Sequence, residues 1–189
     1  METVYMGTYP QNDPDMNESI EWLVLKKEED RALLLSKYAL DCQPYNPLMY
    51  SWNDVTWETC TLRVFLNDFF FDYAFMKSEK ERIRTERLVN TDNGCCAGGN
   101  DTEDRIFLLS LDEVKEYIPD IDTAESIPTA HAKFNGAPTD LDGRSWAWLR
   151  SPGLSRGSAA GINYSGTLNY IGCPMDSPSA VRPAMWINI

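Results

Sequence analysis

The stretch Ser145-Trp-Ala-Trp-Leu149 opens a C-terminal part of the chain that differs from everything before it. Its two tryptophans alternate with smaller residues, which is the period-two pattern of a half-buried strand. Further on, Ala159–Tyr164 and Thr167–Tyr170 flank Ser165–Gly166, which has the residue types of a two-residue hairpin turn. The residues after Gly143 are therefore predicted to be rich in strands and loops.

The charge pattern of the chain changes in the same region. The whole chain has 17 basic and 29 acidic side chains and a net charge of −12, whereas the only charged residues from Ser151 to Ile189 are Arg156, Asp176 and Arg182. Binding to a phosphate backbone or an anionic membrane needs a cluster of lysines and arginines. The composition therefore argues against nucleic-acid binding and against membrane docking. The C-terminal segment is instead rich in Gly, Ser, Asn, Pro and Tyr.

Further strands are expected near both ends of the chain and at one place in its middle. The segments are Glu2–Tyr9, Ile20–Leu25, Ala32–Tyr38, Asp104–Leu109 and Val181–Ile189. The second and third form a hairpin around the charged turn at 27–31, since their Val and Leu content suits a half-buried pair. Pro183 gives the last strand an edge position, because proline cannot donate to a ladder.

Helices are expected in the middle of the chain. One apolar stripe at helical spacing consists of Leu62, Phe65, Leu66, Phe69 and Tyr73. Asp54 or Thr56 is the expected cap of this helix. Ser78-x-x-Glu81 and Ser110-x-x-Glu113 are capping-box patterns that open two short helices. Pro128 and Gly136 are the expected first residue and stop of another.

Catalytic and metal-binding patterns are sparse. His131 is the only histidine and has no nucleophile motif near it, so a structural or surface role is expected. One histidine and no CxxC spacing also argue against zinc. Asp140-x-Asp142-Gly143 resembles half of a calcium loop but lacks the distal Glu, which favours an ordinary turn. Trp52-Asn-Asp54 resembles a lectin calcium motif but precedes a helix, so no calcium role is expected of it.

The cysteines are expected to be mostly reduced and partly buried. Their odd number leaves at least one unpaired, and the adjacent pair is not expected to bridge. They are Cys42, Cys60, Cys95, Cys96 and Cys173. No signal-peptide pattern follows Met1 and no apolar run reaches membrane-spanning length, so no membrane insertion is expected.

Six blocks along the chain carry a resemblance to a known family. They are Glu21-Trp-Leu-Val-Leu25, Arg31-Ala-Leu-Leu-Leu-Ser-Lys-Tyr38, Thr56-Trp-Glu-Thr-Cys-Thr-Leu-Arg63, Asp104-Arg-Ile-Phe-Leu-Leu-Ser110, Trp148-Leu-Arg-Ser-Pro-Gly153 and Val181-Arg-Pro-Ala-Met-Trp-Ile187. The set resembles an uncharacterised domain family of gut bacteria and their phages. Members of that family look like C-type-lectin-fold proteins, and many resemble the variable proteins of diversity-generating retroelements, which are targets of reverse-transcriptase-driven mutagenesis.

The resemblance implies a fold class and a role for the C-terminal segment. The expected fold is α+β: one C-type-lectin-like domain over residues 1–189, with short helices packed on a small antiparallel sheet and a loop-rich β ligand face. In the family, the segment between the last two blocks is rich in Asn and Ser around a Ser-x-Gly-x-Val core. Here the core is Tyr164-Ser-Gly-Thr-Leu168, and many of the expected asparagines are replaced.

These replacements place a variable ligand-binding segment at about 154–179. Tyr and Arg are typical of binding hot spots, and Gly/Ser settings are typical of paratope loops. The residues expected to contact a ligand are Leu154, Arg156, Ser158, Tyr164, Tyr170, Ile171, Cys173, Met175, Asp176 and Ser177. By composition alone, an ordinary β-meander with scattered apolar residues explains the segment equally well.

The predicted function is a non-enzymatic, receptor- or adhesin-like binding protein. Its expected partner is a protein or cell-surface ligand, its expected state is a monomer, and display on a bacterial or phage surface is consistent with the resemblance. Two alternatives stay open. One is an enzyme of the formylglycine-generating, sulfatase-modifying kind, for which Cys173 lacks a partner cysteine nearby in sequence. The other is a carbohydrate-binding lectin that depends on calcium, the one case in which a cofactor is expected.

Overall fold

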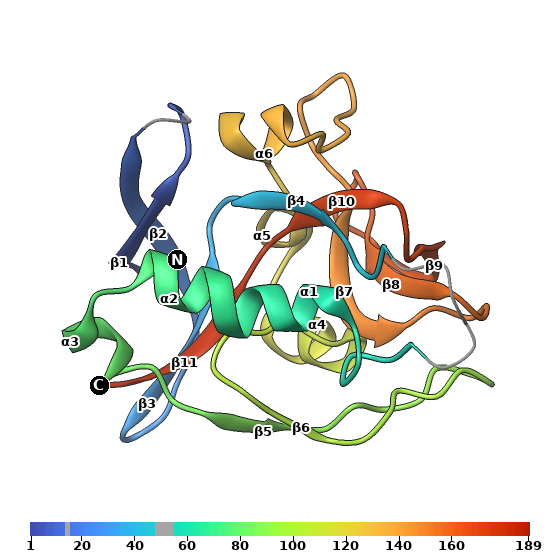
Figure 1. Ribbon diagram of the computed structural model, residues 1–189, viewed down its shortest axis with the longest axis horizontal. Helices are drawn as coiled ribbons and strands as arrows, with labels where there is room; N and C mark the ends of the chain where they lie inside the picture. Colours follow the sequence, from blue (N-terminus) through green and yellow to red (C-terminus); the bar gives the residue numbers. More distant parts are fainter. Residues whose placement is uncertain (14–15, 48–54) are drawn as a thin grey trace.

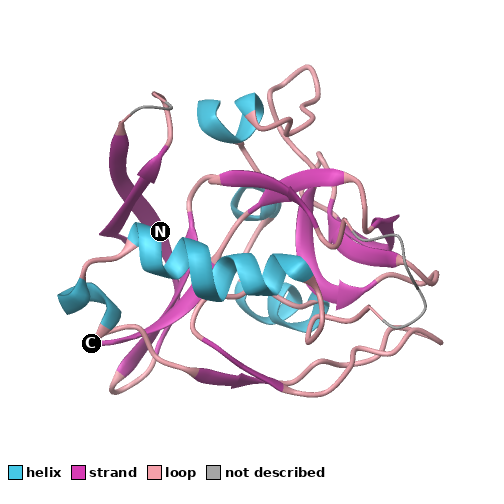
Figure 2. Cartoon of the chain, viewed as in Figure 1, coloured by secondary structure: helices cyan, strands magenta, loops and turns pink. Residues whose placement is uncertain are grey.

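The structure is a computed structural model that describes residues 1–13, 16–47 and 55–189 (Figure 1). Strands and bridges account for 39% of the described residues and helices for 19%, and the strands form two main sheets and a two-stranded ribbon (Figure 2). The expected α+β C-type lectin fold with one small sheet is therefore wrong. The chain has a β-rich fold, because strands distant in sequence pair into sheets larger than local patterns indicate.

The first sheet joins the two ends of the chain. Its order is β1 (Thr3–Pro10), β2 (Asn17–Lys27), β3 (Arg31–Ser36) and β11 (Ala184–Asn188), and all its pairs are antiparallel. The expected first strand, hairpin and terminal strand are thus confirmed. β11 lies at the edge of the sheet, as the proline before it predicts.

The second sheet carries the C-terminal segment. Its order is β4 (Asp41–Pro44), β10 (Pro178–Val181), β7 (Ala147–Pro152), β8 (Ser158–Ile162) and β9 (Leu168–Pro174). β10 runs parallel to β7, and the other neighbours are antiparallel. The predicted hairpin is present as β8 and β9, but its turn runs from Asn163 to Thr167 rather than over two residues. The Asn163 side chain accepts from the backbone N–H groups of Ser165 and Thr167 and so holds the longer turn.

The ribbon pairs β5 (Glu86–Leu88) with β6 (Thr102–Asp104). The strand expected over Asp104–Leu109 is largely wrong, since regular pairing ends at Asp104 and continues only as a bridge between Phe107 and Ala184. That segment is buried against the core instead, which gives it a strand-like apolar pattern.

The predicted apolar stripe forms one continuous helical rod. It consists of α1 (Thr61–Phe65), a π-helical turn η1 (Leu66–Phe70) and α2 (Phe71–Ala74). The expected cap Thr56 is wrong: the rod begins later, and the Cys60 side chain accepts from the N–H of Arg63. Asp54, the other expected cap, lies outside the described residues.

The short helices test the two capping boxes. α4 (Leu111–Tyr117) is confirmed with its box, in which Ser110 and Glu113 satisfy each other's backbone N–H groups. α3 (Lys77–Lys80) begins earlier than predicted, because Glu79 rather than Glu81 accepts from the backbone N–H ahead of the helix, that of Met76.

Two further helices flank the second sheet. α5 (Ile121–Ala124), capped by Asp120, has no predicted counterpart. α6 (Ala130–Phe134) begins after Pro128, with Thr129 as its cap. Gly136 follows it with φ 100°, a left-handed stop as predicted.

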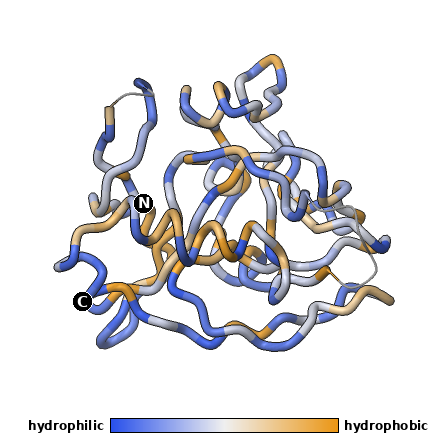
Figure 3. Tube along the Cα trace, viewed as in Figure 1, coloured by the Kyte–Doolittle hydropathy of each residue, from blue (hydrophilic) through white to orange (hydrophobic). Residues whose placement is uncertain are grey.

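Apolar stretches of the trace run along the helical rod and the strands behind it (Figure 3). Trp57, Trp148 and Tyr45 are fully buried, and each has a polar partner. The indole of Trp57 donates to Asp104, that of Trp148 to the carbonyl of Gln43, and the hydroxyl of Tyr45 to the carbonyl of Arg150. Within the described ranges, no helix has the length and apolar character of a membrane span.

Candidate functional site

The residues predicted to contact a ligand differ widely in exposure. Leu154, Tyr170 and Ile171 are exposed by 44%, 38% and 67%, and Arg156 and Asp176 are exposed as well. The other predicted residues are half-buried or buried: Tyr164, Cys173, Ser177, Ser158 and Met175.

The structure corrects the expected exposure of Ser158 and Met175. The Ser158 hydroxyl lies 2.6 Å from the carbonyl oxygen of Ser155 and 3.1 Å from that of Ile171, so it closes the loop between β7 and β8. Met175 belongs to the main hydrophobic core. Both side chains nevertheless line a pocket, described below, from its inner wall.

Tyr164 lies apart from the other predicted residues. It follows β8, whereas Arg156 precedes that strand, and five residues of strand extend about 16 Å. Its ring packs against the main core, as does the half-buried Cys173 on β9. The segment 154–179 therefore presents two separate ends of a hairpin, and only one of them carries the pocket.

The β7–β8 loop has a fixed shape that holds the backbone of Leu154 against β9. A Cβ atom on Gly153 would lie 2.2 Å from the Ser158 hydroxyl oxygen, so only glycine fits there. The N–H of Leu154 lies 3.0 Å from the carbonyl oxygen of Tyr170 and 3.1 Å from that of Ile171. This contact brings the backbone of Leu154 next to that of Tyr170 and Ile171.

A second loop is attached to this hairpin by one amide. Asn93 and Cys96 form a tight turn through two backbone hydrogen bonds, with Gly94 at φ 62°. The Asn93 side chain donates to the carbonyl oxygens of Pro152 and Tyr170, at 2.9 and 3.0 Å. The 93–97 loop therefore stands over the β7–β8 loop at a defined position.

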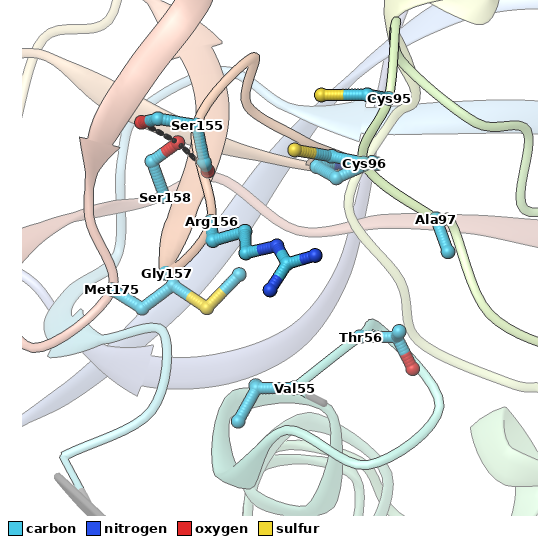
Figure 4. A pocket seen from close by; sticks show the side chains of 11 residues that line it. Val55, Thr56, Cys95, Cys96, Ala97, Ser155, Arg156, Gly157, Ser158 and Met175 are labelled. Carbon is cyan, nitrogen blue, oxygen red and sulfur yellow. Dashed lines mark hydrogen bonds between the residues drawn. The ribbon is translucent and has the colours of Figure 1, made fainter. Parts of the chain in front are cut away.

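A pocket of about 260 Å³ lies between these loops. Figure 4 shows the Arg156 side chain extending into it, with Met175 along one wall and the thiols of Cys95 and Cys96 pointing across toward Ser155 and Ser158 of the β7–β8 loop. Eight of the lining residues were not predicted from the sequence: Val55, Thr56, Cys95, Cys96, Ala97, Pro152, Ser155 and Gly157. The Asn93–Gly94 pair was a detectable turn signal, but nothing local showed what that turn faces.

The pocket is weakly polar except for one cation. Within the described residues, Arg156 has neither a hydrogen bond nor an ion pair. Burial and the neighbouring Cys95 raise the pKa of the Cys96 thiol, and the Arg156 guanidinium partly offsets this. At neutral pH the pocket therefore contains a neutral Cys96 thiol beside the Arg156 guanidinium, which forms no ion pair with a described residue.

The thiols differ enough for chemical labelling to test their placement. Burial raises the pKa of Cys42 to about 11 and that of Cys60 to about 12, so neither forms much thiolate at mildly alkaline pH. Cys95 is exposed at the pocket. We expect iodoacetamide to modify Cys95 first and to modify Cys42 and Cys60 only in unfolding concentrations of denaturant, with peptide mass spectrometry locating each adduct. Equal rates for Cys60 and Cys95 in the native protein would contradict this placement.

Comparison with known proteins gives a family but no characterised relative. Neither the search of curated proteins nor the search of solved structures found a match. A family model described as a domain of unknown function, DUF6273, matches residues 29–189. The match does not address the resemblance to retroelement variable proteins, which stays a prediction. Because the matched region contains all of the chain from β3 to β11, the chain belongs to the DUF6273 family.

Proposed function

We propose that this chain is a non-enzymatic binding protein whose ligand face is the pocket around Arg156 together with the exposed side chains of Leu154, Tyr170 and Ile171. The observation that carries the proposal is the contrast between Arg156 and the arginines on either side of it along the chain. Arg150 and Arg182 are buried and fully engaged, whereas Arg156 is exposed, faces a pocket and has no partner in the described structure.

The chemistry of this face favours a ligand with an anionic group next to an apolar part. A guanidinium binds carboxylate or phosphate oxygens in a fork-like geometry. Leu154, two residues before Arg156 in the same loop, and Tyr170 and Ile171 on β9 offer exposed apolar contact area of the kind that interface cores use. We infer a protein or cell-surface ligand that presents an acidic group beside an apolar side chain or chain segment.

The enzyme alternative gains no support from its cysteine. Burial raises the pKa of Cys173, whereas a nucleophilic thiol is activated by a lowered pKa. Cys173 also packs against the main core rather than lining the pocket. No specific observation favours the calcium-dependent lectin alternative.

We further propose that the face is diversified among relatives of this chain. Of the positions expected to vary, five are exposed on loops or on the outer strand: Leu154, Arg156, Tyr170, Ile171 and Asp176. Exposed positions tolerate replacement at about ±0.5 kcal/mol each. The genome gives the test. A near-copy of the coding segment for Trp148 to Ile189, differing only at adenines and lying beside a reverse transcriptase gene, is expected, and a locus without one contradicts diversification.

A small-molecule experiment tests the binding face itself. Benzoate combines a carboxylate with an apolar ring, and benzyl alcohol keeps the ring without the charge. We expect benzoate to shift the NMR resonances of the 93–97 and 153–157 loops, and Arg156→Gln to weaken that binding by at least about tenfold, as loss of a charge-assisted hydrogen bond implies.

The matched control is Arg87→Gln, which removes another exposed arginine, one that does not line the pocket. It should leave benzoate binding unchanged. Benzyl alcohol binding as tightly as benzoate, or benzoate binding that survives Arg156→Gln, would contradict the proposed role of Arg156.

A further inference from the structure

A second cleft, of about 370 Å³, lies where β1, β4, the helical rod and α6 converge. It shares no lining residue with the pocket around Arg156. We call it the aromatic cleft, and its lining residues are Tyr9, Pro10, Asp41, Gln43, Phe65, Phe69, Tyr73, His131 and Asn135. In Figure 1, β1 and the β8–β9 hairpin lie on opposite sides of the molecule.

Aromatic rings form two walls of the cleft. Along the helical rod, the ring of Phe69 stacks on Phe65 at 5.7 Å and on Tyr73 at 5.5 Å, with interplanar angles of 24° and 11°. The ring of Tyr9 stands across from this column at 86° to Tyr73. Phe69 and Tyr73 are exposed by 55% and 47%, although large apolar rings on a helix usually face the core.

The helix geometry places these rings. The π-helical turn η1 contains Phe69 and widens the rod at the middle of the column. Such turns are rare and occur frequently at functional sites. Phe70, the next residue, is buried and packs against Tyr9. The rod thus anchors itself through Phe70 while leaving Phe69 at the solvent.

The floor of the cleft holds a buried carboxylate without a cation. Asp41 accepts from the Tyr9 hydroxyl at 2.6 Å, from the Cys42 N–H at 2.7 Å and from the Asn135 amide at 2.9 Å. Its side chain has no lysine or arginine partner among the described residues. Buried charges are normally paired with a cation or a metal, whereas three hydrogen bonds stabilise this carboxylate and no described cation offsets its charge.

Donors in the cleft are already in use. The Asn135 amide donates to Asp41 and lies 3.0 Å from Nε2 of His131, so Nε2 accepts and the proton of a neutral ring is on Nδ1. Nδ1 is buried and points to no partner. The groups that remain available to a ligand are the side-chain amide of Gln43, the side-chain carbonyl oxygen of Asn135, the remaining lone pairs of Asp41 and the exposed parts of the Phe69 and Tyr73 rings.

The residues at the mouth of the cleft are negatively charged, as Asp41 on its floor is. Asp68 and Asp72 line an adjoining hollow together with Phe69 and Tyr73, and no lysine or arginine lines either space. Asp72 is paired with Lys80, whereas Asp68 has no ion pair in the described ranges. Ring faces and carboxylates together attract a positive, weakly hydrated group.

We propose that the aromatic cleft binds an organic cation, namely an alkylated ammonium group. The cation would lie against the exposed rings of Phe69 and Tyr73, with Asp41, Asp68 and Asp72 supplying negative charge. A neutral sugar fits these groups less well, since its hydroxyls would need donors as well as acceptors, and the donors of Tyr9 and Asn135 are already engaged.

Choline and its neutral isostere 3,3-dimethylbutan-1-ol test the proposal in isothermal titration, since they differ in charge and hardly in shape. We expect choline to bind at least about tenfold more tightly, the size that a partly desolvated cation–π contact gives. We expect Phe69→Leu with Tyr73→Leu to abolish binding, and Tyr73→Phe to retain it because the ring stays. Asp68→Asn should weaken binding, more at low salt than at high salt.

Several results would overturn the proposal. They are no choline binding to the unmodified protein, equal binding of the neutral isostere, binding unaffected by the double leucine variant, and binding of neutral sugars in preference to choline. Thermal melts of each variant establish that it is folded, and the exposure of both rings makes a folded double variant the expected outcome. Arg156→Gln should not change choline binding, which keeps this test separate from that of the Arg156 pocket.

Discussion

Arg150→Met is expected to lower the free energy of unfolding by about 3–5 kcal/mol, the effect of removing one partner from a buried ion pair. The Arg150 guanidinium donates to both carboxylate oxygens of Glu113 and, at 2.9 Å, to the carbonyl oxygen of Leu108. The same Glu113 carboxylate accepts from the N–H of Ser110 and so caps α4. Losing Arg150 therefore leaves the half-buried Glu113 carboxylate unpaired and weakens the contact between β7 and α4.

Denaturant unfolding monitored by tryptophan fluorescence measures this effect. The matched control is Arg87→Met, which removes an exposed arginine that is also ion-paired, to Asp101 at 2.8 Å. Exposed pairs contribute less than about 1 kcal/mol. Changes of similar size in the two variants would mean that Arg150 does not hold the second sheet to α4.

Arg182→Met is expected to cost at least about 3 kcal/mol, because it leaves several buried carbonyl groups without a donor at about 1–3 kcal/mol each. The Arg182 side chain donates to the carbonyl oxygens of Thr123 at 2.7 Å and of Ser36 at 2.8 Å, with longer contacts to Ala124 and Glu125. It thereby satisfies the end of α5 and joins that helix to β3.

Arg182→Lys separates charge from geometry in this case. A lysine keeps the positive charge but cannot reach both groups of acceptors at once. We expect it to recover only part of the lost stability in the same unfolding measurement. Full recovery would show that charge alone matters, and an unaffected methionine variant would show that the carbonyl contacts do not stabilise the fold.

Arg150 and Arg182 show why only part of the scaffold could be predicted from the sequence. Both lie in blocks that carried the family resemblance, but an arginine is normally an exposed residue. Nothing local indicates that Arg150 and Arg182 are buried. Their burial depends on acceptors 37 and 146 residues away along the chain, on Glu113 and Ser36.

Local chemistry was predicted well where it acts alone. The capping box of α4 and the Gly136 stop depend on a few adjacent residues, and both are present. The fold class was wrong because the parallel contact of β10 with β7 and the return of β11 to β3 are long-range pairings. A strand pattern does not name its partner.

In the candidate site too, features set by adjacent residues were predicted and features set by distant segments were missed. Leu154, Ile171 and Arg156 were correctly expected to be exposed, since they lie on a Gly- and Ser-rich loop and an outer strand. The burial of Met175 and Ser158 depends on how the hairpin closes, and the facing wall at Cys95 and Cys96 comes from a loop distant in sequence. The aromatic cleft was missed because Phe69 and Tyr73 belong to a stripe that predicts core.

The central claim is that a stable scaffold carries an exposed binding face whose residues contribute little to folding. The most direct test is the unfolding free energy of Leu154→Ala, Tyr170→Ala and Ile171→Ala combined, with Ile162→Ala on the neighbouring strand as the buried control. We expect the unfolding free energy to fall by less than about 1.5 kcal/mol in the triple variant and by about 2–5 kcal/mol in the control. A triple variant that loses as much as the control would show that these side chains belong to the core, and would contradict the account.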